Sequence, residues 1–243
     1  MEGAPDQLVA EGFVAFRQGR DDEAQELFER SAELARESGN AQVLAQALGG
    51  LARVALRARE IERTRELALQ ALELAEDEQG QRSPRHMLAA AARAEGDYAR
   101  AEELYGETLA LARRLGLRLA EAAELLNLGY VALHLGKKEL MIDRFRESLE
   151  VAADLNDDYL LPYCVMGAAS SALARGDPDE AARLLGAAKA AFDRSGAAID
   201  PGSAEEYEAI AAHLGHDYDA AWAEGSRLTL DEAVARARRA RPA

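Results

Sequence analysis

One short phrase returns five times along the chain at a nearly constant spacing. In each copy, a turn residue is followed after five and after nine positions by residues that suit the inward face of a helix. The third copy has Gly96, Ala101 and Tyr105 in these places. The five turn residues are Gly19, Arg59, Gly96, Gly136 and Gly176. A phrase that ends one helix and begins the next, repeated about every forty residues, predicts a stack of helix pairs.

Composition supports helices throughout. Apolar residues make up 49% of the chain and aromatic residues only 5%, because the apolar share is mostly Ala and Leu, which favour helices and close helix packing. Apolar periodicity and turn residues predict paired helices at 6–18 with 21–38, 41–57 with 60–75, 84–95 with 97–115, 119–135 with 137–155, and 159–175 with 178–195. Residues 78–84 are expected to form a loop before the third pair.

The chain changes character after residue 195. Residues 196–203 are rich in Gly, Pro and Ser and predict a linker. Three shorter helices are expected at 205–214, 218–224 and 230–241, and Thr229 with Glu232 fits a capping box at the last of them. We therefore predict a repeat domain at 1–200 and a helical cap at 201–243, with Trp222 as an anchor of the cap.

The repeated pattern resembles the tetratricopeptide repeat in a long-helix form. The small residue that this family places in the first helix of each pair falls twelve positions before the first inward residue of the second helix, and here it is Gly12, Ala52, Ala89, Gly129 or Ala169. A small side chain is needed where two helices cross closely. The resemblance implies an all-α, right-handed superhelical solenoid of about five helix pairs, closed by the C-terminal cap.

The last quarter of the chain supports a narrower resemblance. Its motifs look like the tail of bacterial signalling ATPases and LuxR-type transcriptional regulators: Arg183-Leu-Leu-Gly-Ala-Ala, Trp222-Ala-Glu-Gly, and Leu228-Thr-Leu-Asp-Glu-Ala-Val. Those proteins join an ATPase domain to a tetratricopeptide-like sensor region. The chain contains no phosphate-binding Gly-x-x-x-x-Gly-Lys-Ser/Thr loop and no basic reader helix after Val234, so the resemblance implies the sensor part alone.

Charge and cysteine usage narrow the classes of partner. With 29 Lys and Arg against 44 Asp and Glu, the net charge is −15, which repels phosphate backbones and argues against direct nucleic-acid binding. This charge mainly indicates solvated helix faces, with a cationic partner as the alternative. Cys164 is the only cysteine, which excludes an internal disulfide. No secretion signal or membrane span is recognised, so we expect a cytoplasmic protein.

A binding surface is predicted on the first helices of the pairs. The tetratricopeptide resemblance places positions one residue after the small crossing site, and three before and four after it, on an inner groove. The candidates are seven basic, hydrogen-bonding or aromatic residues at or directly beside these positions: Arg53, His86, Arg93, Asn127, Tyr130, His134 and Ser170. Such residues could hold a peptide carboxylate or another anion. The alternative is that they are simply hydrated or paired with neighbouring Glu side chains.

No catalytic or metal-binding motif is recognised. His213 and His216 are three residues apart, but Leu214-Gly215 between them indicates a helix end, so no metal site is predicted. Cys164 is interpreted as a packing residue. We expect no catalytic residues and no cofactor.

The function predicted is a non-catalytic protein- or peptide-interaction module, the sensing region of a bacterial signalling or transcription-regulating system. Its partner would be a protein, a peptide or a small effector. One alternative is a small-molecule-binding protein or enzyme that uses the groove as a closed pocket containing Tyr130 and His134. A second is self-association into a homo-oligomer through an end repeat.

Overall fold

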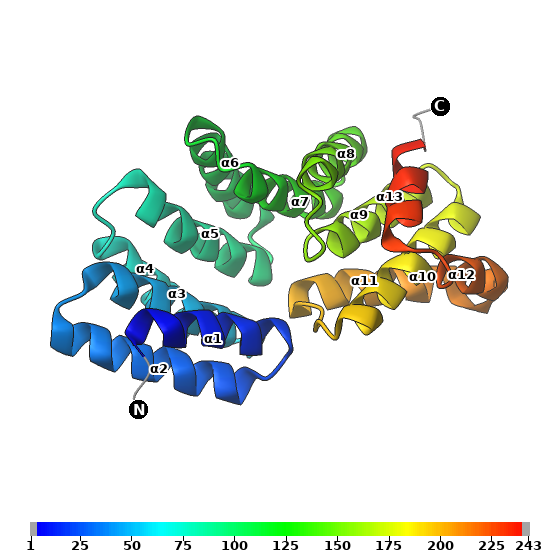
Figure 1. Ribbon diagram of the computed structural model, residues 1–243. Helices are drawn as coiled ribbons and strands as arrows, with labels where there is room; N and C mark the ends of the chain where they lie inside the picture. The colour runs from blue at the N-terminus through cyan, green and yellow to red at the C-terminus, as the bar shows by residue number, and fades with distance from the viewer. Residues whose placement is uncertain (1–3, 240–243) are drawn as a thin grey trace. The chain divides into compact units, whose positions relative to one another are not determined.

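The computed structural model describes residues 4–239, and this part of the chain is all-α. Its first ten helices are α1 (Pro5–Arg17), α2 (Asp21–Ser38), α3 (Ala41–Arg57), α4 (Ile61–Glu73), α5 (Glu78–Ala94), α6 (Tyr98–Arg114), α7 (Arg118–His134), α8 (Lys138–Leu155), α9 (Leu161–Ala174) and α10 (Pro178–Ser195) (Figure 1). They form the five predicted antiparallel pairs, which confirms the fold class.

The remaining elements are α11 (Pro201–Leu214), the short 3-10 helix η1 (Gly215–Tyr218), α12 (Asp219–Gly225) and α13 (Leu230–Arg239). The contacts divide the chain into two compact units, residues 1–111 and 112–243, with the boundary inside α6. In the first unit, α1 packs on α2 and α3 packs on α2, α4 and α5; in the second, α7 packs on α8 and α9 packs on α8 and α10. The predicted division at residue 200 is a different one and stays a prediction.

The turns inside the pairs adopt one backbone conformation. All five predicted turn residues have positive φ, from 65° at Arg59 to 82° at Gly96 and Gly176. The amide after each turn bonds back to a carbonyl near the end of the first helix, as Asp97 N does to Ala92 O at 3.0 Å. The left-handed turn therefore closes the first helix and aims the chain into the second.

Two helices begin earlier than the sequence pattern predicts. The Asp77 carboxylate accepts a hydrogen bond from Gly80 N at 2.8 Å, so α5 begins at Glu78 and Pro84 lies inside it. The loop expected at 78–84 is therefore wrong, because the cap at Asp77 outweighs the amide that Pro84 lacks. Likewise, α11 begins at Pro201, within the predicted linker, since proline suits the first position of a helix.

Glycines let two phenylalanine rings fill the helix crossings. A Cβ atom at Gly12 or Gly50 would overlap the ring of Phe28, at 2.6 and 2.5 Å, so this ring lies between α1 and α3. Phe145 lies in the same way between Gly129 of α7 and Gly167 of α9. The other predicted crossing residues, Ala52, Ala89 and Ala169, are fully buried. Close crossing at the small positions is thus realised in the structure.

The C-terminal helices are attached to the fifth pair. Gly186 of α10 and Gly225 of α12 face each other so closely that a Cβ on either would overlap the backbone of the other helix. Arg236 of α13 donates to both carboxylate oxygens of Glu180 at 2.8 Å. The predicted capping box is present, because Thr229 N donates to Glu232 Oε2 at 2.8 Å and Glu232 N to Thr229 Oγ1 at 3.2 Å. The hydrogen bonds that Thr229 N and Thr229 Oγ1 donate to the Glu232 carboxylate lower its pKa.

Candidate functional site

The first unit holds three of the candidate residues on neighbouring helices. Arg53 lies on α3, and His86 and Arg93 lie on α5, which packs on α3. Arg53 is half-buried and, among residues 4–239, makes no hydrogen bond or ion pair. The His86 ring meets the Tyr105 ring edge-on, with 5.6 Å between centroids. Arg53 is therefore a guanidinium with donors available to a ligand.

Arg57, one turn further along α3, has a different role. Its Nη1 donates to Phe16 O and to Asp21 Oδ1, both at 2.7 Å, and its guanidinium lies 3.5 Å from the centroid of the Phe16 ring. The side chain is only 9% exposed. These contacts hold α3 against the turn between α1 and α2.

The second unit holds three candidates on one face of α7. Asn127, Tyr130 and His134 are spaced i, i+3 and i+7. Asn127 Nδ2 donates to Ala123 O in its own helix at 2.9 Å. Tyr130 is 1% exposed, and its ring packs edge-on against Phe145 with 4.9 Å between centroids. The expectation of an accessible Tyr130 is corrected, because its ring completes the crossing filled by Phe145.

His134, at the end of α7, is engaged within the chain. Its Nε2 lies 2.6 Å from Oε1 of Glu206 on α11. Glu206 is only 8% exposed, although it is acidic. The contact joins residues 72 positions apart and brings α11 onto the same side of the unit as the α7 candidates. The pattern along α7 contained no signal for this partner.

Ser170, the candidate on α9, is also covered. It is 5% exposed, and its hydroxyl donates to Met166 O at 3.3 Å. Tyr163, Met166 and Ser170 are spaced i, i+3 and i+7, and we call this surface the α9 face. At one end of it, Asp200 N donates to the Tyr163 hydroxyl at 3.2 Å, and α11 packs on α9. The predicted exposure of Ser170 is wrong because the chain itself covers the α9 face.

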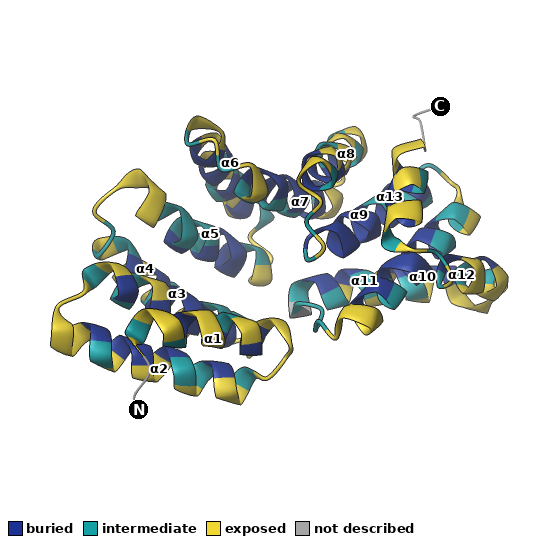
Figure 2. Ribbon diagram, in the orientation of Figure 1, coloured by how far each residue is buried: buried dark blue, intermediate teal, exposed yellow. Residues whose placement is uncertain are grey.

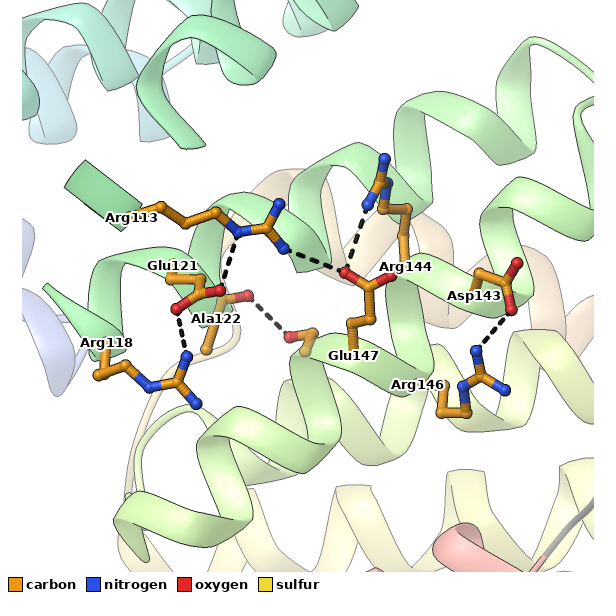
Figure 3. A network of polar contacts seen from close by, with 9 residues as sticks. Arg113, Arg118, Glu121, Ala122, Asp143, Arg144, Arg146 and Glu147 are labelled. Carbon is orange, nitrogen blue, oxygen red and sulfur yellow. Dashed lines mark hydrogen bonds and ion pairs between the residues drawn. The ribbon is translucent and has the colours of Figure 1, made fainter. Parts of the chain in front are cut away.

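A polar network outside the prediction joins the last turn of α6 to α7 and α8 (Figure 3). Arg113 Nε donates to Glu121 Oε1 at 2.9 Å, and its Nη2 donates to Glu147 Oε2 at 3.2 Å. Arg118 also donates to Glu121, and Arg144 to Glu147. The hydrogen bond to Glu121 raises the pKa of Arg113. Because both carboxylates are already shared, the network is interpreted as a brace between α6, α7 and α8.

The described part of the chain offers neither a reactive thiol nor a cluster of metal ligands. Cys164 is fully buried 3.3 Å from Ser148 Oγ, and burial raises the pKa of its thiol to about 12, so it is not a thiolate nucleophile near neutral pH. Among residues 4–239, no three His, Cys, Asp or Glu side chains are grouped as metal ligands. In the same range, no helix is both long enough and apolar enough to cross a lipid bilayer.

Comparison with known proteins agrees with the fold. Tetratricopeptide-repeat family models match residues 8–77 and 85–119, so these parts of the chain are similar to tetratricopeptide repeats. No curated protein matches it significantly in sequence. The motifs that resemble signalling ATPases and LuxR-type regulators lie at residues 183–234, outside both matches, and that narrower resemblance stays a prediction.

Three solved structures of similar fold are compared with this chain. The apo form of RapI has a TM-score of 0.63 at 13% identity, with 91% of this chain and 81% of that one covered. Aspartyl phosphate phosphatase F from Bacillus subtilis has a TM-score of 0.64 at 14% sequence identity, with 89% of this chain covered. A Rap protein complexed with competence and sporulation factor has a TM-score of 0.60 at 18% sequence identity, with 83% of this chain covered. This chain spans 57% and 54% of the latter two. At these identities, the likeness shows the fold alone.

Proposed function

We propose that this chain is a non-catalytic module that binds a peptide or a protein segment along the first helices of its pairs. In this proposal it serves as the sensing region of a bacterial signalling or transcription-regulating system. The observation that carries the proposal is Arg53, a half-buried guanidinium without a partner among residues 4–239, on the helix face where the tetratricopeptide resemblance places the ligand.

Electrostatics supports an anionic group on the ligand. A half-buried arginine binds a carboxylate more strongly than an exposed one, because water screens the pair less. His86 and Arg93 add polar groups on α5, the helix next to Arg53. The fold is also able to hold a partner in other proteins, since one structure of similar fold is a complex with competence and sporulation factor. Tyr130 and His134, which the closed-pocket alternative would use, are engaged with Phe145 and Glu206.

A display selection on the full chain tests the proposal. A library of random peptides is selected on the wild-type protein, and each binder is titrated against Arg53→Ala and Arg100→Ala. Arg100 is the matched control, because its side chain is 54% exposed, pairs with Glu103 and lies on α6, which is the second helix of its pair and not part of the proposed surface. We expect Arg53→Ala to weaken acidic or C-terminal-carboxylate peptides about tenfold and Arg100→Ala to leave them unchanged. Binders that lose equal affinity in both variants would refute this surface.

A further inference from the structure

The α9 face differs from the equivalent surface of α3. The crossing residues Ala52 and Ala169 align the two helices, so Gln46 and Arg53 of α3 correspond to Tyr163 and Ser170 of α9. Gln46 is exposed and Arg53 half-buried, whereas Tyr163 and Ser170 are 3% and 5% exposed. Within 160–172, every residue except Ala168 is buried, and α9 is mostly dark blue in Figure 2. A helix that is apolar on all sides needs a cover on each.

Helices α11 and α13 both pack on α9, and α11 is an amphipathic helix with a weak apolar stripe. Its buried positions are Ser203, Glu206, Ile210 and Leu214, while Glu205, Glu208 and His213 are exposed. Two of the four buried residues are polar, so this stripe buries less apolar surface than one of four leucines would. Two specific polar contacts fix α11 and the residue before it. Asp200 N donates to the Tyr163 hydroxyl, and Glu206 Oε1 is hydrogen-bonded to His134 Nε2.

The helices after α11 are anchored by contacts of their own. The close glycine crossing at Gly186 and Gly225 holds α12 on α10, and Arg183 Nε donates to Glu224 Oε2 at 2.7 Å. The pair of Arg236 with Glu180 holds α13. One aromatic contact, Tyr207 with Trp222 at 5.9 Å between centroids, links α11 to α12. Helices α12 and α13 are therefore held on α9 and α10 by contacts that do not involve α11.

We propose that the α9 face, with His134, is a docking surface for an amphipathic helix of a partner protein, and that α11 is its intramolecular occupant. The partner helix carries a carboxylate at the position of Glu206, to meet His134, and apolar residues along the rest of its stripe. The partner helix exchanges with α11. Because α11 is tethered to the same chain, its effective concentration is high, and this sets the partner concentration that is needed to displace it. This inference rests on the proposed function, because it names a second element of the same binding module.

Hydrogen exchange on the full chain tests whether α11 opens alone. Glu206→Gln removes the charge that meets His134, and Glu208→Gln makes the same change on the exposed side of α11. We expect residues 201–214 to exchange about tenfold faster in Glu206→Gln only, with 219–239 unchanged in both variants. Equal exchange in the two variants, or joint opening of 201–239, would overturn the proposal.

A peptide added in trans tests whether the α9 face accepts a helix. The probe is a fluorescein-labelled synthetic peptide of residues 198–216, titrated into the full chain. We expect Glu206→Gln/Ile210→Asp, which weakens the intramolecular α11, to bind it at least about tenfold more tightly than wild type, since the tethered competitor is removed. Adding His134→Gln should reverse most of the gain. Equal affinity for wild type and the α11 variant would refute an exchangeable occupant.

The two tests separate the two proposals. The display selection depends on Arg53 in the first unit, whereas the exchange and peptide measurements depend on His134 and α11 in the second. Loss of the Arg53 effect with an intact trans-peptide result would remove the proposed surface and keep the docking site. An intact Arg53 effect without trans-peptide binding would keep the proposed surface and remove the docking site. A molar mass of two chains for the wild-type protein alone, lowered to one chain by the added peptide, would identify a second copy as the partner and contradict a separate partner protein.

Discussion

At the scale of single residues, one turn departs from the others in its side chain. Arg59 has φ of 65°, in the region where the other four phrase turns have glycine. A Cβ atom in this region costs about 1 kcal/mol or more. We expect Arg59→Gly to be more stable than Arg59→Ala by about 1 kcal/mol, because both remove the arginine contacts and only glycine relieves the backbone. Urea unfolding measures the difference, and equal stabilities would show that the turn is unstrained.

A second residue-scale prediction concerns the buried thiol of Cys164. Burial raises its pKa from 9.0 to about 12, so its contribution to stability is complete below pH 9 and is lost as pH rises toward 12. Between about pH 8 and pH 10, the unfolded thiol ionises and the folded one does not, which costs about 1.4 kcal/mol. Cys164→Ala should lack this part of the alkaline loss of stability, while both proteins keep the part that comes from Tyr163 and Tyr207, whose pKa values are also raised by burial. Parallel pH curves in denaturant unfolding would contradict the prediction.

At the scale of elements, the glycine crossings decide how the pairs stack. Gly129→Ala would place a methyl group against the Phe145 ring. The ring cannot move away from Gly129, because the backbone of α9 at Gly167 lies on its other side. We expect a loss of about 1–3 kcal/mol. Phe145→Leu, which copies Leu185 of the fifth pair, should recover part of it in the double variant. Gly106→Ala is the control, because nothing lies within 4 Å of its added Cβ. A stabilising Gly129→Ala would mean that the crossing is loose.

At the scale of the whole molecule, the net charge is the dominant electrostatic property. A charge of −15 favours expansion through self-repulsion, and exposed ion pairs such as Arg100 with Glu103 contribute little in return. We expect the melting temperature to rise by a few degrees between about 20 and 300 mM NaCl, because screening reduces the repulsion. Calorimetry at several salt concentrations measures it. A steady fall with salt would show that ion-pair networks outweigh the net charge.

The sequence by itself determined the elements of this protein. Five helix pairs, the turn conformation at Gly19 or Gly96, and the small crossing residues follow from local periodicity, since each depends on residues within about one repeat. The pattern misplaced the start of α5, where the cap at Asp77 prevailed over Pro84. It also identified which helix carries each candidate of the binding surface, as for Arg53.

Only the tertiary structure decided what those candidates touch. Arg57 bonds to Asp21 across 36 residues, and His134 meets Glu206 across 72. Tyr130 packs against Phe145 at the helix crossing, and Ser170 is buried on a helix against which α11 and α13 pack. Helical periodicity assigns a residue to a face, but whether that face is open depends on which distant element packs there. That choice is made by the shape and polarity of both surfaces together, which no single repeat contains.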